Sequence, residues 1–168
     1  IQQILRSDPS LQFSLNGDQQ APPEYVASAK REKVREQLQF LRADCANAEI
    51  RLHRVNELKE SANKCFEQGA HANALQTYLT GIWLLKEDDA PVTPALTLEA
   101  GIAPHGGDVV ATLGSGRRAL GEAEQPAEFG PLRDVLHLNA ADALLALHDY
   151  SSARAACEFV LARQPLNS

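Results

Sequence analysis

The most informative segment of this sequence is residues 59–82, KESANKCFEQGAHANALQTYLTGI. It contains two amphipathic runs, and Gly69 separates them where a turn between two helices is expected. Small residues at Ala62, Ala74 and Gly81 permit close approach of paired helices, and larger residues between them fill the remaining space. The segment therefore predicts a helix–turn–helix hairpin.

A second segment with the same pattern lies near the C-terminus, in residues 139–165. Ala153 follows Ala74 by 79 residues, and the same offset brings Ala141 into register with Ala62. Two copies in one register are a stronger signal than one, because an accidental match at one position need not extend to the next. The sequence therefore predicts an all-α protein that contains two related helix pairs.

Both segments resemble tetratricopeptide repeats, including the Ala-x-x-x-aromatic element at Ala74 and Tyr78. The second copy departs from the family pattern at His148, where glycine is usual, and at Cys157, where an aromatic residue is usual. The resemblance implies a fold of stacked helix pairs whose first helices line a concave groove for a peptide.

The family repeat is about 34 residues long, so an offset of 79 residues implies an insertion of about 45 residues between the copies. Sparse apolar residues and turn signals before residue 24 predict a tail or linker. We therefore expect five segments, namely a tail or linker (1–23), a long N-terminal helix continuing into the first repeat (24–57), repeat 1 (58–86), an acidic insertion rich in glycine and proline (87–130), and repeat 2 with the start of a possible third repeat (131–168).

Residues 24–68 contain neither glycine nor proline, and apolar residues recur every three or four positions. This pattern predicts a long helix. It would pack either along its own domain, with a kink or break near Ala46–Asn47, or in a coiled-coil dimer. The stripe includes Cys45 and Ala48 and then meets Lys59, which makes a poor coiled-coil seam. We therefore prefer the helix that packs on its own domain.

Residues 86–130 hold eight acidic and three basic side chains, which is most of the net charge of −6. A loop of this length is usually functional or disordered. Within it, residues 108–113 are expected to form a short strand or turn. Residues 114–118, GSGRR, lack the spacing of phosphate-binding loops and are interpreted as a flexible linker.

The bulk composition excludes several classes of protein. The negative net charge argues against a nucleic-acid binder, and no apolar run approaches the length of a membrane span or follows the pattern of a signal peptide. Cys45, Cys65 and Cys157 show no metal-ligand spacing and are interpreted as buried small residues in a reducing compartment. We therefore expect a cytoplasmic protein without nucleic-acid or membrane partners.

We expect no catalytic site, no metal and no cofactor in this chain. The histidines are dispersed and interpreted as surface or turn residues, and none pairs with Cys or a carboxylate at metal-ligand spacing on one element. They are His53, His71, His105, His137 and His148. An enzyme function remains only for a domain outside this chain, such as a prolyl isomerase by analogy with the large immunophilins.

The candidate site is a peptide-binding one. Lys59 and Asn63 are four residues apart, so they project from one face of a helix, and Asn139 begins the equivalent helix of the second copy. An ammonium group and two carboxamides suit a peptide carboxylate. These three residues resemble the carboxylate clamp of co-chaperones that hold the acidic C-terminal tails of cytosolic heat-shock chaperones. The resemblance implies such a tail as partner, and it implies two further basic residues just beyond Ser168.

Two alternatives remain open. The asparagines can instead cap or bridge neighbouring helices while Lys59 is merely solvated. At the level of function, the chain can be a structural scaffold subunit of a larger assembly, with the groove filled by its own chain or by another helix.

Overall fold

A computed structural model describes residues 23–99, 101–114 and 127–163, and within them it contains six α-helices, one short 3-10 helix and no strand. The elements are α3 (Pro23–Asp44), α4 (Ala48–Glu67), α5 (His71–Leu84), η1 (Pro94–Leu96), α6 (Gly106–Leu113), α7 (Phe129–Ala146) and α8 (Tyr150–Arg163). The all-α class is therefore confirmed for the described residues. None of the helices in these ranges is long and apolar enough to cross a membrane.

Residues 24–68 form two helices instead of one. The first ends at Asp44, and Asn47 caps the second, because its side-chain oxygen accepts hydrogen bonds from the backbone N–H groups of Glu49, at 2.8 Å, and Ile50, at 3.4 Å. An asparagine in this position satisfies backbone donors that have no partner within the helix. The continuous helix expected over residues 24–57 is thus interrupted, and the break lies near Ala46–Asn47.

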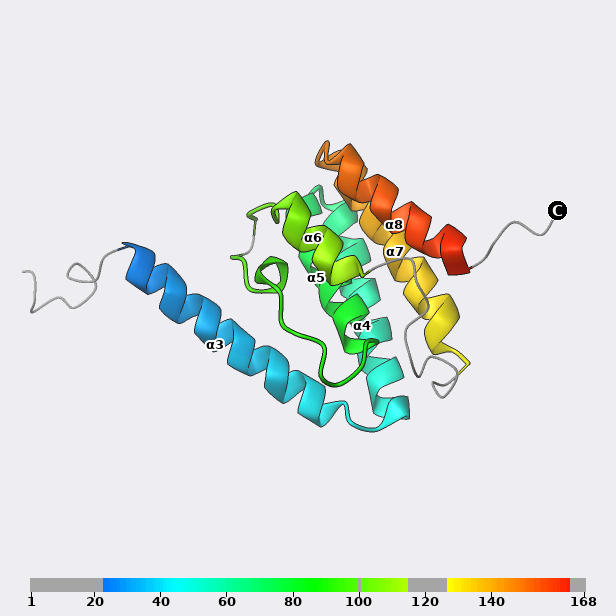
Figure 1. Ribbon diagram of the computed structural model, residues 1–168, viewed down its shortest axis with the longest axis horizontal. Coiled ribbons are helices and arrows are strands. Elements are labelled where there is room, and N and C mark those ends of the chain that lie inside the picture. The colour runs from blue at the N-terminus through cyan, green and yellow to red at the C-terminus, as the bar shows by residue number, and fades with distance from the viewer. Residues whose placement is uncertain (1–22, 100, 115–126, 164–168) are drawn as a thin grey trace, which may run out of the picture.

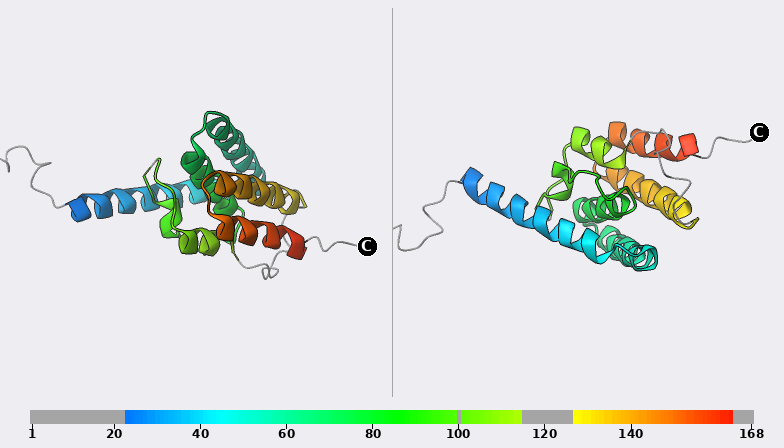
Figure 2. Two further views of the ribbon diagram at one scale, coloured as in Figure 1. Left: turned by 90° about the horizontal axis from the view of Figure 1, so that it is seen from above. Right: turned by 60° about the horizontal axis from the view of Figure 1, so that its bottom comes forward.

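The central part of the molecule consists of two helix hairpins. Helices α4 and α5 form the first hairpin, α7 and α8 form the second, and packing of α5 against α7 joins them (Figures 1 and 2). Gly81 lies where α4, α5 and α7 meet, and a Cβ atom there would lie 3.3 Å from Leu136 Cδ1 and 3.5 Å from Val55 Cγ1. Glycine therefore allows the three helices to approach closely at this point.

The two hairpin turns have the same backbone geometry. Gly69 and His148, which occupy equivalent positions 79 residues apart, both have positive φ angles, of 81° and 64°. In each turn the following residue donates its backbone N–H to the carbonyl five positions back, at 2.9 Å. This is the hydrogen bond of a Schellman-type helix end, which requires a left-handed residue. His148 therefore adopts the conformation that glycine adopts in the first turn.

Much of the expected insertion belongs to the core. Ala95 and Leu96 of η1 are buried, as are Val109 and Leu113 of α6. Helix α6 packs against α5 and α8 (Figure 1). The strand or turn expected over residues 108–113 is wrong, since Val109 and Leu113 lie four residues apart on one face of a helix. Of the 114–118 linker, only Gly114 lies within the described residues, and the start of a possible third repeat, after residue 163, lies outside them.

Candidate functional site

The structure brings Asn63 and Asn139 together, although 76 positions separate them. The side-chain nitrogen of Asn139, on α7, donates to Asn63 Oδ1, on α4, across 3.5 Å. Lys59 lies one turn before Asn63 on the same helix, and all three residues are half-buried. Among the described residues, Lys59 has no ion-pair or hydrogen-bond partner. We name Lys59, Asn63 and Asn139 the amide surface.

Tyr78 of α5 also contacts the amide surface. Its hydroxyl donates a hydrogen bond to Asn63 Oδ1, and its side chain is only 2% exposed. Burial raises the pKa of Tyr78, and the neighbouring Asp142, Cys65 and Glu67 raise it further. The phenol therefore remains protonated and available as a donor at neutral pH. The sequence pattern indicates only a space-filling aromatic residue at Tyr78, because the hydrogen bond to Asn63 crosses the hairpin turn.

Two carboxylates lie close to the amide surface. Asp142 follows Asn139 by one turn of α7, and Glu67 follows Asn63 by one turn of α4. Both side chains are exposed, and both are near enough to Tyr78 to raise its pKa. Among these described residues, an anionic ligand at the amide surface therefore meets the cation of Lys59 and the anionic neighbours Asp142 and Glu67.

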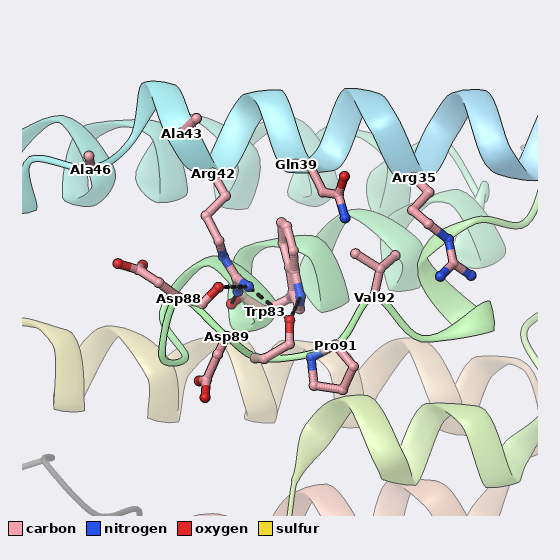
Figure 3. A pocket seen from close by; sticks show the side chains of 11 residues that line it. Arg35, Gln39, Arg42, Ala43, Ala46, Trp83, Asp88, Asp89, Pro91 and Val92 are labelled. Carbon is pink, nitrogen blue, oxygen red and sulfur yellow. Dashed lines mark hydrogen bonds between the residues drawn. The ribbon is translucent and has the colours of Figure 1, made fainter.

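A separate pocket of about 530 Å³ lies between α3 and the segment that follows α5. Figure 3 shows Arg42 of α3 reaching across it toward that segment. The guanidinium carbon lies 3.6 Å from the centroid of the Trp83 ring, and the group donates to the carbonyls of Ala90, at 2.9 Å, and Asp88, at 3.1 Å. A third hydrogen bond goes to the carbonyl of Trp83.

These contacts attach α3 to the rest of the molecule. Burial is the main cause that lowers the pKa of Arg42 to about 10, and Arg51 contributes while Asp88 opposes it. Arg51 also forms an ion pair with Asp88 at 2.7 Å. Because the Arg42 side chain joins α3 to three backbone carbonyls of the segment that begins at Trp83, we assign the arrangement a structural role. The sequence contains one signal for this contact. Arg42 follows Leu38 by four residues, which places a charged side chain on the apolar stripe of the helix.

Two interpretations of single residue types are corrected. His137 is fully buried, whereas it was expected at the surface or in a turn, and it stacks on Phe159 with ring centroids 3.9 Å apart. Cys45 is buried, but Cys65 and Cys157 are only half-buried, and all three are free thiols.

Within the described ranges, no group of three or more His, Cys, Asp and Glu side chains is placed to hold a metal ion.

Comparison of this chain with protein-family models finds no match, and neither does comparison with curated proteins or with solved structures. The internal geometry of the chain therefore carries the functional argument.

Proposed function

We propose that this chain is a protein-interaction adaptor of the tetratricopeptide-repeat type, which binds the C-terminal carboxylate of a partner peptide at the amide surface. The observation that carries the proposal is the convergence of Asn63 and Asn139 from two helices, beside the ammonium group of Lys59, which has no partner among the described residues. Donors of this kind from separate elements suit a carboxylate, which accepts several hydrogen bonds at once.

The repeat architecture is supported by the equivalence of the two hairpins. Each turn has a left-handed residue, at position 69 or 148, and the residue after it makes the same backbone hydrogen bond. The left-handed residues lie 79 positions apart, and so do the donors of the two hydrogen bonds. This offset is the one at which the two sequence copies align. Equivalent backbone geometry at equivalent sequence positions is what a duplicated helix pair produces.

The partner that the sequence resemblance implies is the acidic tail of a heat-shock chaperone. The described residues around the amide surface favour the terminal carboxylate of such a tail more than its other acidic groups, because Asp142 and Glu67 lie nearby and Lys59 is the one cation of the amide surface. Binding through one exposed or half-exposed cation is weak and is screened by salt. We therefore expect micromolar or weaker affinity that decreases as ionic strength rises.

A fluorescence titration tests this function. The probe is a short fluorescein-labelled peptide that ends in Asp, and the matched control is the same peptide with an amidated C-terminus. We expect the free acid to bind at least about fivefold more tightly, since charge-assisted hydrogen bonds contribute more than neutral ones. Equal binding of the two peptides would eliminate the carboxylate site.

A scaffold function is favoured by a different observation. Val135, Leu138 and Leu145 of α7 are exposed apolar side chains, and Phe40 of α3 is 72% exposed. Exposed apolar residues at helical spacing are typical of a face that another helix covers. In a scaffold subunit, the face of α7 that carries Val135, Leu138 and Leu145 would be protected from hydrogen exchange only within the assembly. Size-exclusion chromatography and hydrogen exchange of the isolated chain separate the two functions, because an adaptor remains monomeric and binds the free-acid peptide.

A further inference from the structure

Asn63 Oδ1 is surrounded by two hydrogen-bond donors, Tyr78 and Asn139. We propose that Tyr78 is a positioning residue, which holds the Asn63 carboxamide so that its N–H groups face the ligand. The proposal rests on the proposed function of the amide surface and adds a determinant of specificity to it. Tyr78 itself does not contact the ligand.

A carboxamide has two nearly isosteric orientations, one with its oxygen outward and one with its nitrogen outward. In the structure, Asn63 Oδ1 is directed toward the Tyr78 hydroxyl and the Asn139 nitrogen. A flipped amide could donate to the Tyr78 oxygen, but the Tyr78 hydroxyl proton would then have no acceptor among the described residues. The flipped N–H groups would also lie against the Asn139 nitrogen, which is itself a donor. A flipped amide would also present an oxygen to an incoming carboxylate, and two acceptors repel one another. The observed orientation is therefore the one that binds an anion.

Tyr78 is suited to hold this orientation because its hydroxyl has little freedom to move. The ring is 2% exposed and belongs to the buried core, whereas Asn139 is half-buried and its hydrogen bond is long, at 3.5 Å. The raised pKa of the phenol keeps its proton in place. A buried, protonated donor fixes its acceptor more strongly than a long and partly solvated one.

The second hairpin has no equivalent arrangement. The residues that correspond to Asn63 and Tyr78, 79 positions later, are Asp142 and Cys157. A carboxylate has no N–H groups to present, and a thiol is a weak donor. The oriented amide therefore has no counterpart at these positions of the second hairpin, although the turns of the two hairpins share one geometry.

The consequence is selectivity between a free C-terminus and an amidated one. A carboxylate accepts hydrogen bonds from the outward N–H groups, whereas a terminal amide also presents donors of its own. If Tyr78 no longer donates to Asn63, the amide is free to rotate and accommodate the amidated peptide. Loss of the Tyr78 hydroxyl should therefore reduce the ratio of the affinity for the free acid to the affinity for the amidated peptide. The stability of the chain and the affinity for peptide as such should change less.

The experiment compares Tyr78→Phe with Tyr150→Phe in the full chain, using the free-acid and amidated peptides of the titration above. Tyr150 is a matched control, because it also loses a phenolic hydroxyl but is 62% exposed and lies outside the amide surface. We expect Tyr78→Phe to bring the acid-to-amide ratio down from at least about fivefold in wild type to between about one and two, because the charge-assisted hydrogen bond that favours the free acid is weakened. Tyr150→Phe should leave the ratio within about twofold of wild type.

A second measurement does not depend on any core substitution. In wild-type protein labelled with ¹⁵N-asparagine, the side-chain N–H signals of Asn63, assigned from their absence in Asn63→Ala, should shift when the free-acid peptide is added and shift less with the amide. The outcomes separate the two proposals. If wild type discriminates between the peptides but Tyr78→Phe discriminates equally well, the positioning role of Tyr78 is refuted and the adaptor function stands. If the Asn63 signals stay unmoved by the free acid, the carboxylate does not bind at Asn63, and both proposals are refuted. If wild type itself does not discriminate, both are refuted.

Discussion

The two hairpins have the same turn geometry, but they differ in what covers their second helix. One face of α5 is buried beneath α6 and α7, whereas the equivalent face of α8 is exposed in the described structure. The corresponding residues are Leu75 and Arg154, Leu79 and Glu158, and Ile82 and Leu161. On α8, Arg154 and Glu158 form an ion pair with each other at 2.8 Å. The turn geometry is thus a local property, while the chemistry of each outer face follows its neighbours.

The largest expected effect contrasts the two faces directly. Leu79→Ala removes a fully buried side chain from the core, and it should lower the free energy of unfolding by roughly 3 to 4 kcal/mol. Glu158→Ala, at the equivalent position of α8, removes one partner of an exposed ion pair and should change it by less than about 1 kcal/mol. Urea denaturation of both variants measures the contrast. Similar losses at the two sites would show that α8 is covered as α5 is.

The second prediction concerns His137, whose equivalent in the first hairpin is Leu58. Burial is the main cause that lowers the pKa of His137 to about 4, and Arg133 and Lys86 contribute, while hydrogen bonds to the carbonyls of Arg133 and Leu113 oppose the shift. Because the ordinary pKa is near 6.5, the unfolded state binds an extra proton between about pH 6.5 and pH 4.

Stability should therefore decrease as the pH falls through this window, by about 2 to 3 kcal/mol from this residue. Chemical denaturation at a series of pH values, compared between wild type and His137→Leu, isolates its contribution from that of the carboxylates. The variant should lose that part of the pH dependence. If the free energy of unfolding of His137→Leu depends on pH as steeply as that of wild type, His137 is protonated in the folded protein.

The smallest expected effect tests the equivalence of the turns. A non-glycine residue in the left-handed region costs about 1 kcal/mol or somewhat more. His148→Gly should therefore stabilise the chain by about 1 kcal/mol, and Gly69→Ala should destabilise it by a similar amount. Thermal and urea unfolding of the two variants give the values. Effects of the same sign would contradict the common turn geometry, although the His148 ring also contacts the Tyr150 hydroxyl at 3.0 Å, which reduces the gain.

Local spacing predicted the parts of the molecule that depend on nearby residues. The two hairpins, the break near Asn47 and the shared face of Lys59 and Asn63 all follow from helical periodicity, caps and turn residues. The core role of residues 94–113 was missed, because glycine and proline flank short apolar groups there. Only contacts with α5 and α8 make Leu96 and Leu113 part of the core.

The sequence by itself determined that the described part of the chain is helical, that it contains two helix hairpins whose turns lie 79 residues apart, and that an ammonium and a carboxamide share one helix face. The tertiary structure decided which groups meet across helices. Asn139 reaches Asn63 only because α7 packs beside α4 and α5, and Tyr78 donates to the same oxygen only because the first hairpin closes. The physical reason is range, since helix geometry acts over four residues, whereas the direction of an amide depends on donors that the folded chain brings from 15 and 76 positions away.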